Sequence, residues 1–566
     1  MSLSHIATYK GPVSCDTETS GFKWWRDEIG VVSFAWGGLD TEAFATRNVE
    51  AALSALHCRM EQGLPTIFHN SSFDLHFLRE RGLKINWSCI EDTLLMARLR
   101  DNLGQHDLDA LGLSVLGIEK GKSVVREYLR KGKKAFVTEH GREPNFLDVP
   151  DDILLPYAVR DASLTWKLHQ EFSKTFEPLL QRELKIRRLM FEAEHRGIKV
   201  NLELALQRYE WAKREQWAIE QRLTEMRGHE INLDSNDQLR TWLYQDLGLK
   251  ARTYTPTGLE QVNEFNLASN PHPVTRLLST RNHRVKSAEF FMSYLELADS
   301  KGFIHPTVNT MQARTHRFSA SDPNVQQVPV RNDRFSTREV FEATYLIGAD
   351  YDKQELRIAA EEAGDQQLLA SIVNGEDVYR DMAAVMLNKP SSSIIYSERQ
   401  AAKVAVLSMI YGAGAPKVGE SFTVNTGKPY STEQAKTIRD NFYRKHPALK
   451  RLMNRMQQEV RSNGGVRNRW GRWLNVELTR AYVATDYLVQ SSGRDVLADA
   501  LLNLAEVLPK YGGYLLWPVH DEALMIVPEE PSPELLAEIA EAMVSRKFSL
   551  PLTVTPKYGK SMKELK

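Results

Sequence analysis

The sequence predicts an α/β domain at its N-terminus, followed by a larger α+β region that is mostly helical. Residues 1–178 alternate short apolar runs with segments of helical periodicity, which is typical of a central sheet covered by helices. From residue 179 onward helix formers dominate, but strand-like runs return at 345–350 and 515–527. A chain of 566 residues also exceeds what one hydrophobic core usually serves, so we expect several domains.

The elements of the first domain follow from its apolar pattern. The expected strands are residues 11–15, 30–36 and 66–69. The expected helices are residues 49–62, 71–82 and 153–176. The composition changes after the dipeptide Glu177-Pro178, so we place the domain boundary near residue 178.

The second region, 179–566, contains long helical segments and two returns to strand character. The expected helices are residues 203–226 within 179–242, then 354–386, 397–411, 431–444, 447–463, 479–508 and 533–547. The expected strands are residues 302–308, 345–350 and a hairpin at 515–527. No internal repeat or low-complexity segment occurs, which argues against a solenoid or a disordered linker.

Composition indicates a globular protein but leaves its partners open. Hydrophobic residues make up 42% and charged residues 26%. The 73 basic and 73 acidic residues cancel, so net charge argues neither for nor against nucleic acid. Apolar stretches end well short of the roughly 18 residues that suggest a membrane span, and the N-terminus lacks a signal pattern. We therefore expect a cytosolic protein with reduced thiols at Cys15, Cys58 and Cys89.

Basic residues gather in three places, at 281–286, 439–450 and 467–472. A charge run is most often a solvated face. The cluster at 467–472 is less ordinary because Trp470 stands among its arginines, a combination typical of surfaces that bind single strands.

Two carboxylates of the second region stand at the ends of predicted strands. Asp350 ends the apolar run 345–349, and Asp521 lies at the tip of the hairpin that continues as 523–527. If the two strand ends meet, the acids can hold two divalent cations about 3.5–4 Å apart. That arrangement stabilises both the attacking and the leaving oxygen in phosphoryl transfer and indicates nucleotidyl-transfer chemistry.

A second group of acids lies in the first domain. Asp16 and Glu18 follow a strand and share one side of the extended chain. Asp74 follows another strand, and Tyr157 and Asp161 share a helix face because they are four residues apart. Four acids and a tyrosine can surround two metal ions, and the tyrosine hydroxyl can orient an attacking water.

One predicted helix carries a stripe of functional side chains. Arg399, Lys403, Leu407 and Tyr411 follow one another at intervals of four residues, so they form a stripe about 18 Å long. The two cations can bind a triphosphate, and Tyr411 can pack beside a base pair. The alternative interpretation is a solvated basic helix end.

The acids of the first domain resemble a known family. Asp16-x-Glu18, Asn70-x-x-x-Asp74 and Tyr157-x-x-x-Asp161 are similar, in order and spacing, to the three motifs of the DEDD-type 3′–5′ exonucleases that have a tyrosine in the third motif. The resemblance implies an RNase H-like fold. It also implies that Asp16, Glu18, Asp74 and Asp161 are metal ligands and that Tyr157 positions the nucleophilic water.

The second region resembles the family A DNA polymerases. Residues 350–357, 399–412 and 519–522 are similar to motifs A, B and C, and residues 315–319 and 322–326 to the primer-template contact segment. The resemblance implies a right-hand polymerase domain at 179–566. Its thumb would be about residues 200–300, its palm about 301–360 and 481–566, and its fingers about 361–480.

The resemblance also implies a role for each matched residue. Asp350 and Asp521 would hold the metals, with Glu522 as an auxiliary carboxylate. Glu355 and Tyr411 would crowd the sugar 2′ carbon and exclude ribonucleotides, Leu407 would line the nucleotide site, and Lys403 would assist the leaving pyrophosphate. The expected primer-template contacts are Arg317, Asn324, Gln326, Gln490 and His520.

Several positions depart from the family pattern. Leu407 stands where an aromatic residue is usual, Asp352-Lys353-Gln354 replaces Ser-Gln-Ile in motif A, and Asp486 replaces an Asn. Such divergence favours a phage-type replicative enzyme, and it suggests adaptation to a modified base. The chain begins almost at the exonuclease, so we expect no 5′ nuclease domain.

The resulting hypothesis is a monomeric DNA-directed DNA polymerase with a proofreading exonuclease. It would use two Mg²⁺ ions per site, with Mn²⁺ as a substitute, and act on primer-template DNA and dNTPs, beside a helicase or other replisome proteins. The alternatives are a 3′–5′ exonuclease whose C-terminal half only clamps nucleic acid, a noncatalytic replication scaffold, and an RNA-synthesising enzyme. The intact acids oppose the first two, and Glu355 opposes the third.

Overall fold

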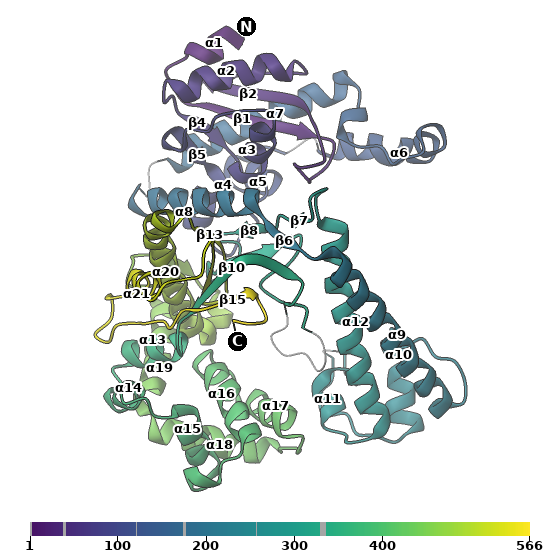
Figure 1. Ribbon diagram of the computed structural model, residues 1–566, viewed down its shortest axis with the longest axis vertical. Helices are drawn as coiled ribbons and strands as arrows, with labels where there is room; N and C mark the ends of the chain where they lie inside the picture. Colours follow the sequence, from purple (N-terminus) through teal and green to yellow (C-terminus); the bar gives the residue numbers. More distant parts are fainter. Residues whose placement is uncertain are drawn as a thin grey trace. The chain divides into compact units, whose positions relative to one another are not determined.

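The computed structural model describes residues 3–37, 41–119, 122–173, 177–255, 257–328 and 336–565. The chain forms two compact units (Figure 1). The first unit is Met1–Arg196 with Val308–Ser319, and the second is Gly197–Thr307 with Ala320–Lys566. Within the described residues, no helix is both long and apolar enough to cross a membrane.

The first unit is built on a five-stranded sheet in the order β3-β2-β1-β4-β5. Its strands are β1 (Val13–Thr19), β2 (Ile29–Gly37), β3 (Thr41–Thr46), β4 (Thr66–Phe68) and β5 (Ile90–Asp92). The central strand β1 pairs antiparallel with β2 and parallel with β4. The α/β prediction is confirmed, although β3 and β5 were not expected.

Helices surround this sheet. They are α1 (Leu3–Thr8), α2 (Val49–Glu61), α3 (Ser71–Glu80), α4 (Thr93–Arg100), α5 (Leu108–Leu116), α6 (Lys122–His140), α7 (Asp151–Phe172) and α8 (Glu177–Arg196), with short 3₁₀ turns η1 (Trp87–Cys89) and η2 (Phe146–Asp148). Helix α7 packs across β1, β2 and β3. It therefore covers the strand that carries the first pair of acids.

The first unit extends further along the chain than the sequence predicts. The change of composition placed the boundary near residue 178, whereas the structure keeps all of α8 and residues 308–319 in this unit. The reason is packing, because Leu180 and Leu184 of α8 share a buried core with Met311. These contacts join segments more than 100 residues apart, which local composition does not reveal.

A buried ionic network fastens these segments. The Glu194 carboxylate of α8 accepts hydrogen bonds from the Ser72 hydroxyl at 2.7 Å and the backbone N–H of Val308 at 2.6 Å, and from His76 Nε2 at 3.0 Å. Arg187 Nη2 lies 2.7 Å from the same carboxylate. Burial alone would raise the pKa of Glu194, but Arg187, His76 and Ser72 outweigh it and lower the pKa to about 2. The charged carboxylate therefore stabilises the fold.

Replacing Glu194 with glutamine should destabilise the protein at neutral pH by roughly 3 kcal/mol, the free energy that a pKa lowered from 4.5 to about 2 represents. Because the folded pKa is depressed, this contribution is present above about pH 4.5 and is lost as the pH falls toward 2. Urea unfolding of both proteins at pH 7 and near pH 3 measures the difference. The matched control is Glu192→Gln on the same helix, whose partner Arg79 is 34% exposed.

A difference between wild type and Glu194→Gln that stays constant with pH would contradict this account. The Glu192→Gln variant should lose less than about 1 kcal/mol at any pH, because partly exposed pairs are screened by solvent.

The second unit contains a six-stranded sheet with the order β13-β14-β10-β6-β7 and with β15 paired to β10. Its strands are β6 (Ile198–Val200), β7 (Phe303–Ile304), β10 (Phe341–Asp350), β13 (Tyr514–Val519), β14 (Glu522–Val527) and β15 (Lys557–Ser561). A short hairpin outside this sheet is formed by β11 (Gly465–Arg467) and β12 (Trp473–Asn475), and a separate pair, β8 (Thr307–Asn309) and β9 (Ser319–Ser321), lies at the two ends of residues 308–319. The strands predicted at 345–350 and 515–527 are confirmed, and they lie side by side in this sheet.

Two long helices of the second unit pack along each other and carry a core of their own. They are α9 (Leu202–Arg227) and α12 (Pro273–Leu297), and smaller elements between them are α10 (Asn236–Arg240), the π-helical turn η3 (Thr241–Asp246) and α11 (Glu264–Ala268). Arg281 of the predicted basic cluster 281–286 is buried here, with Glu220 and Asp234 each 2.8 Å away. This arginine stabilises the helix pair and is not part of a basic surface.

The remaining helices of the second unit include the one expected to carry the functional stripe. They are α13 (Gln354–Ala363), α14 (Gln366–Val373), α15 (Val378–Leu387), α16 (Tyr396–Ile410), α17 (Ala415–Thr426), α18 (Thr432–Lys445), α19 (Pro447–Asn463), α20 (Ala484–Val507) and α21 (Pro533–Ala542), with 3₁₀ turns η4 (Ser391–Ser393), η5 (Leu478–Val483) and η6 (Leu508–Tyr511). The prediction of a single helix at 354–386 is wrong, because the structure has the three helices α13, α14 and α15 there. Gly364 and Gly375 adopt positive φ, and Asp365 and Asp377 then cap new helices.

Part of the cluster at 467–472, which the sequence compares with a strand-binding surface, has internal partners instead. Arg472 is fully buried and grips the Asp495 carboxylate with Nε at 2.9 Å and Nη2 at 2.8 Å. Trp470 Nε1 donates to Asp499 at 2.7 Å, and Arg469 Nε donates to Glu362 at 2.6 Å. Arg472, Trp470 and Arg469 therefore hold the β11–β12 hairpin against the rest of its unit.

Candidate active sites

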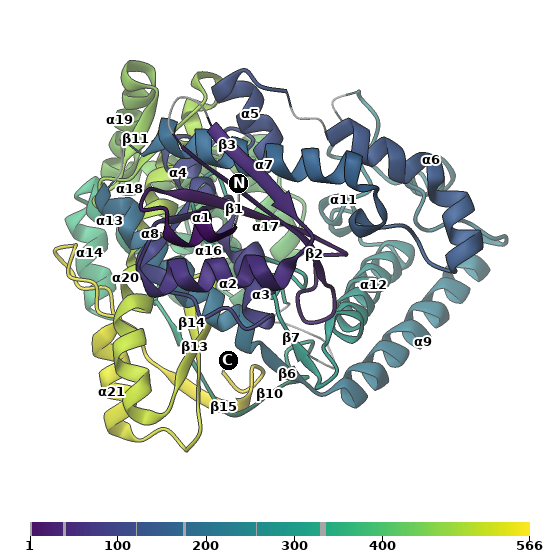
Figure 2. The same ribbon diagram turned by 90° about the horizontal axis from the view of Figure 1, so that it is seen from above.

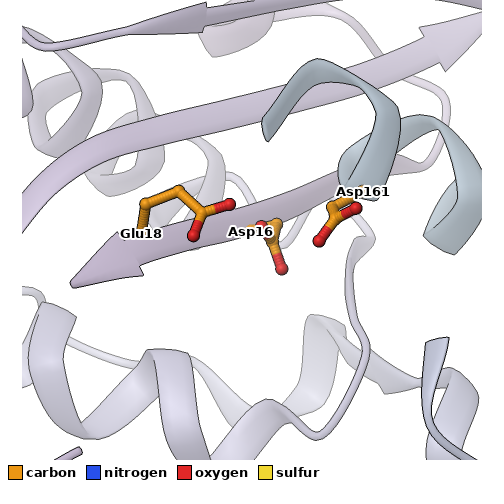
Figure 3. Close-up of side chains that lie close together, drawn as sticks. All are labelled: Asp16, Glu18 and Asp161. Carbon is orange, nitrogen blue, oxygen red and sulfur yellow. The ribbon is translucent and has the colours of Figure 1, made fainter. Parts of the chain in front are cut away.

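Three carboxylates converge on the central strand of the first unit. Asp16 and Glu18 lie on β1, and Asp161 lies on α7 (Figure 3). One oxygen from each acid lies within 4.8 Å of the others, and Glu18 and Asp161 are buried. Among the described residues this is the one group of three or more histidine, cysteine, aspartate or glutamate side chains that approach so closely. The sequence prediction for these three residues agrees with the geometry.

The strand and the helix are held together beside these acids. The buried Ser14 hydroxyl of β1 donates to the carbonyl oxygen of Ala162 at 2.7 Å. Ala162 in turn packs against Ala35 and Ile67 of the sheet. Because Ser14 and Ala162 are neighbours of the acidic positions, this contact sets the distance between Asp161 and β1.

Tyr157 lies one helical turn before Asp161 and is 8% exposed. Its ring packs with Val31 and Ala158. It also makes an edge-to-face contact with the ring of Phe146, with the two ring centroids 5.9 Å apart. Burial first, and then the charges of Asp161 and Glu18, raise the pKa of the Tyr157 hydroxyl. The phenol is therefore neutral beside the acids and can donate a hydrogen bond.

Asp74 occupies a different position from the other three acids. Its Oδ1 accepts hydrogen bonds from the Thr17 backbone N–H at 3.0 Å and from the Thr17 hydroxyl at 2.7 Å. Burial raises the pKa of Asp74 to about 7, although the hydrogen bonds from Thr17 oppose the rise. Thr17 stands between Asp16 and Glu18, so Asp74 is tied to the acidic strand without joining the group of three carboxylates.

The donor set of this site suits a hard divalent cation. Three carboxylates this close repel one another strongly when partly buried, and a cation removes that cost. Carboxylate oxygens are the ligands that Mg²⁺ and Mn²⁺ prefer. The arrangement can therefore support metal-assisted hydrolysis, with the neutral Tyr157 placed to orient a water.

The second site is organised by strand pairing. Strands β10 and β14 are antiparallel, with Tyr345 opposite Val527 at one end and Asp350 opposite Glu522 at the other. Strands β13 and β14 are joined by the two-residue turn His520-Asp521. Asp521 therefore stands one residue from the position opposite Asp350, and the prediction that the two strand ends meet is confirmed.

The hairpin turn is stabilised by its backbone conformation and by hydrogen bonds from a neighbouring segment. His520 has a φ of 60°, a left-handed conformation that lets the chain reverse in two residues. The buried Gln326 amide donates to the Pro518 carbonyl oxygen at 3.0 Å. Asn324 Oδ1 in turn accepts the backbone N–H of Gln326 at 3.2 Å. Gln326, predicted to contact the primer-template, is thus bonded to the hairpin itself.

Glu522 is 4% exposed, while Asp350 is exposed and Asp521 is partly exposed. The Glu522 side chain lies over Gly348, where an added Cβ would come within 2.5 Å of its Oε1. Burial lowers the pKa of the Arg338 guanidinium, and the nearby Glu522 charge opposes that shift. Glu522 therefore packs inside the unit beside the two aspartates.

The predicted stripe lies on α16 and its C-terminal cap, as the spacing indicated. Arg399 Nε is 2.8 Å from Asp377 Oδ2 and 2.9 Å from Asp377 Oδ1. Burial alone would raise the pKa of Asp377, but the hydrogen bond from Arg399 lowers it. Lys403 is exposed, and Leu407 and Tyr411 are partly exposed. Arg399 is therefore held in place, and Lys403 faces solvent.

Sequence reasoning missed Tyr379 of α15, which lies among the predicted site residues. Its ring centroid is 5.7 Å from Lys403 Nζ and 6.0 Å from Arg399 Cζ. Burial first, and then the charge of Glu355, raises the pKa of its hydroxyl, and Asp521 contributes in the same direction. The ring thus lies beside the cations of α16, and the charges of Glu355 on α13 and Asp521 in the hairpin turn act on its hydroxyl. The sequence around Tyr379 carried no signal beyond helix formation.

Close backbone contacts fix the helices around this site. Gln354 of α13 is buried and its amide donates to the Gly493 carbonyl oxygen of α20 at 3.3 Å, which explains one departure in motif A. Gly412 has a φ of 86°, and an added Cβ would lie 2.2 Å from the carbonyl oxygen of Tyr482. Gln490 lies on α20 and is partly exposed. Arg317 lies in 308–319, which belongs to the first unit.

The fold and the two acidic sites define a class of protein, one that joins an α/β unit with a cluster of three carboxylates to a larger α+β unit whose paired strand ends bring acids together. The family model described as DNA polymerase family A matches residues 203–564, and the one described as 3′-5′ exonuclease matches residues 2–177. The chain belongs to DNA polymerase family A and carries a 3′–5′ exonuclease domain.

Named relatives agree with this assignment. The chain is 26% identical over 591 residues to the DNA polymerase of Mycobacterium phage D29, covering 98% of this chain and 93% of that protein. It is 24% identical over 550 residues to DNA polymerase I of Chloroflexus aurantiacus, covering 91% of this chain and 56% of that protein. The chain thus spans about half of that bacterial relative and nearly all of the phage relative.

A solved structure has the same fold. It is described as the POL domain of Pol1 from M. smegmatis in complex with DNA primer-template and dNTP. The TM-score is 0.81 at 22% identity, and the match covers 100% of this chain and 97% of that one.

Proposed function

We propose that this protein is a DNA-directed DNA polymerase that extends a primer 3′ end with dNTPs and removes nucleotides from the same end with its 3′–5′ exonuclease. The observation that carries the proposal is the register of β10 and β14, which brings Asp350 beside Asp521. Family membership over residues 203–564 supports it. That match also disfavours the alternative of a C-terminal half that only clamps nucleic acid.

In the polymerase reaction, the primer 3′ oxygen attacks the α-phosphorus of the dNTP and the bond to pyrophosphate breaks. Asp350 and Asp521 would hold two Mg²⁺ ions, or Mn²⁺, with Glu522 as the buried auxiliary carboxylate. Bound metal supplies charge neutralisation at the attacking and leaving oxygens. Arg399 and Lys403 bind the triphosphate, and Lys403 assists the departing pyrophosphate.

Nucleotide and primer selection are assigned to the residues around this centre. Glu355 and Tyr411 exclude a 2′ hydroxyl by crowding, and Leu407 lines the nucleotide site. Arg317, Gln490, His520 and Asn324 contact the primer-template. Gln326 acts through the hairpin that it supports, since its amide is bonded to Pro518.

In the exonuclease reaction, water attacks the terminal phosphodiester and the terminal nucleotide leaves as a 5′ monophosphate. Asp16, Glu18 and Asp161 would hold the metal, which activates the water when bound. Tyr157 orients that water through its neutral hydroxyl. Asp74 is the fourth acid of the site, and its hydrogen bond with the Thr17 hydroxyl holds it next to Asp16.

The names of the subdomains follow from this assignment. The thumb is the helix pair within residues 200–300, the palm is the sheet within 301–360 and 481–566, and the fingers are the helices within 361–480. We propose that the protein acts as a monomer in the cytosol of a bacterium or a phage-infected host, with a helicase or other replisome proteins as partners. The bacterial and mycobacteriophage relatives support this placement.

The test is a primer-extension assay with the purified chain, a primed DNA template, Mg²⁺ and dNTPs. Extension with dNTPs, degradation of the primer without them, and loss of both on adding a chelator are the expected results. Degradation without any extension would favour the clamp alternative. Extension with ribonucleotides as good as with dNTPs would contradict the role of Glu355.

A further inference from the structure

Helix α6 carries a basic stripe that the proposed reactions do not use. In both views it projects from the rest of the first unit (Figures 1 and 2). Between residues 126 and 134 it has five basic residues and one acid, Glu127. We define the basic stripe as Arg126, Arg130, Lys133 and Lys134. All four are exposed, and their spacing of three and four residues places them along one side of the helix.

The helix that carries the stripe packs against the core next to the exonuclease site. Val125, which precedes Arg126, lies in the same buried core as Tyr157, and the partly buried Leu129, which precedes Arg130, packs against that core. Tyr157 is one helical turn from Asp161 on α7. This part of α6 therefore contacts the core that holds Tyr157 beside the acidic cluster.

A second attachment fastens the other end of α6. Arg142, just past that end, grips the Asp148 carboxylate with Nη1 and Nη2, each at 2.7 Å. Asp148 belongs to the turn η2, which leads directly into α7. Arg142 thus connects the residues that follow α6 to the turn that leads into α7.

The charges of the stripe are only partly neutralised. Lys131 Nζ pairs with Glu127 at 2.6 Å and Lys133 Nζ pairs with Glu143 at 2.7 Å. In the described residues, no ion pair involves Arg126, Arg130 or Lys134. These three are separated by four residues each, and like charges at that spacing destabilise a helix. A bound polyanion would remove this cost.

A solvated basic face is the ordinary explanation of such a helix, but the neighbourhood of the stripe argues for a ligand. The proposed exonuclease must hold a negatively charged strand beside Asp16, Glu18 and Asp161, and a metal bound there neutralises those acids but does not bind the rest of the strand. A line of positive charge on a helix that packs against the same core can bind the phosphates of that strand. The spacing favours a flexible single strand, because one helix side presents a single row of cations.

We propose that the basic stripe of α6 binds the sugar-phosphate backbone of the single-stranded primer end, upstream of the nucleotide being hydrolysed at Asp16, Glu18 and Asp161. This inference rests on the proposed exonuclease function. It assigns to Arg126, Arg130 and Lys134 a role in holding the substrate strand and no role in the chemical step.

The test compares wild type with the double variant Arg126→Gln/Arg130→Gln on a 5′-labelled single-stranded oligonucleotide in Mg²⁺. KM for degradation should rise about tenfold with kcat unchanged, because two phosphate contacts are lost. The slope of log(kcat/KM) against log[salt] should become shallower by about 1.4, since each contact to a single strand contributes about 0.7. Extension of a paired primer should stay at the wild-type rate.

The matched control is Arg81→Gln/Lys84→Gln, which removes the same charge from an exposed part of the first unit. An unchanged KM and salt slope in the α6 variant, or equal changes in the control, would overturn the inference. Equal loss of extension and degradation would also overturn it, by indicating general DNA binding. Wild-type protein that degrades no primer would instead refute the proposed exonuclease, so the two failures are distinguishable. Thermal melts verify that each variant is folded.

Discussion

Replacing Asp521 with asparagine is expected to abolish primer extension and to leave primer degradation at the wild-type rate. Asp521 stands at the hairpin turn, beside the position where Glu522 pairs with Asp350. The substitution keeps the size of the side chain and removes the charge that would hold a metal. We expect a loss of at least about 10³-fold, since a metal-holding carboxylate contributes more than the roughly 10²–10³-fold of one hydrogen-bond donor.

Single-turnover extension of a primed template by one dNTP measures this effect. The turn should survive the change because Gln326 and the β13–β14 pairing support it. Asp440→Asn, which removes an exposed charge from α18, is the matched control and should extend primers normally. If the Asp521→Asn variant extends primers at a rate within about tenfold of wild type, Asp521 does not have the proposed role in the polymerase site.

The second large effect is expected at Asp161, whose change to asparagine should abolish primer degradation and spare extension. Asp161 supplies one of three carboxylate oxygens that lie within 4.8 Å of one another. Without it, the remaining pair, Asp16 and Glu18, should bind a divalent cation weakly, and degradation should fall by at least about 10³-fold. Release of the labelled 3′ nucleotide without dNTPs measures the rate.

The control for this variant lies on the same helix. Asp151 begins α7, pairs with Arg47 and is 59% exposed, so Asp151→Asn should degrade primers at the wild-type rate. A mismatched primer end gives an independent measurement, because Asp161→Asn should extend it without first removing the mismatch. Continued removal of the mismatched nucleotide by Asp161→Asn would contradict the assignment.

Much of the fold was predictable because its signals are local. Apolar runs that end in acids predicted β1, β10 and the β13–β14 hairpin, and the register of β10 and β14 agrees with that prediction. The spacing of Arg399 to Tyr411 likewise predicted α16. Local signals were misread where a positive-φ glycine and an aspartate cap interrupt helical periodicity, at Gly364 and Gly375.

The candidate sites were predictable to the level of residue type. The sequence grouped Asp74 with the other acids, but only the structure shows that its carboxylate accepts a hydrogen bond from the Thr17 hydroxyl. Tyr379 gave no sequence signal, because its place between Lys403 and the acids depends on how α15 packs against α16. The predicted effect of Leu407 on sugar selection and the suggested adaptation to a modified base stay predictions.

By itself, the sequence determined the two kinds of unit, the acids carried by β1, β10 and the hairpin, and the cationic helix α16, since each depends on periodicity or on a charge that follows an apolar run. The tertiary structure decided which charges are exposed. Arg472 and Arg281 are buried against carboxylates, whereas Arg126 and Arg130 of α6 face solvent. The difference has a physical reason: a basic side chain looks the same in sequence whether or not a distant segment supplies its partner, and only the folded chain brings that partner within hydrogen-bond distance.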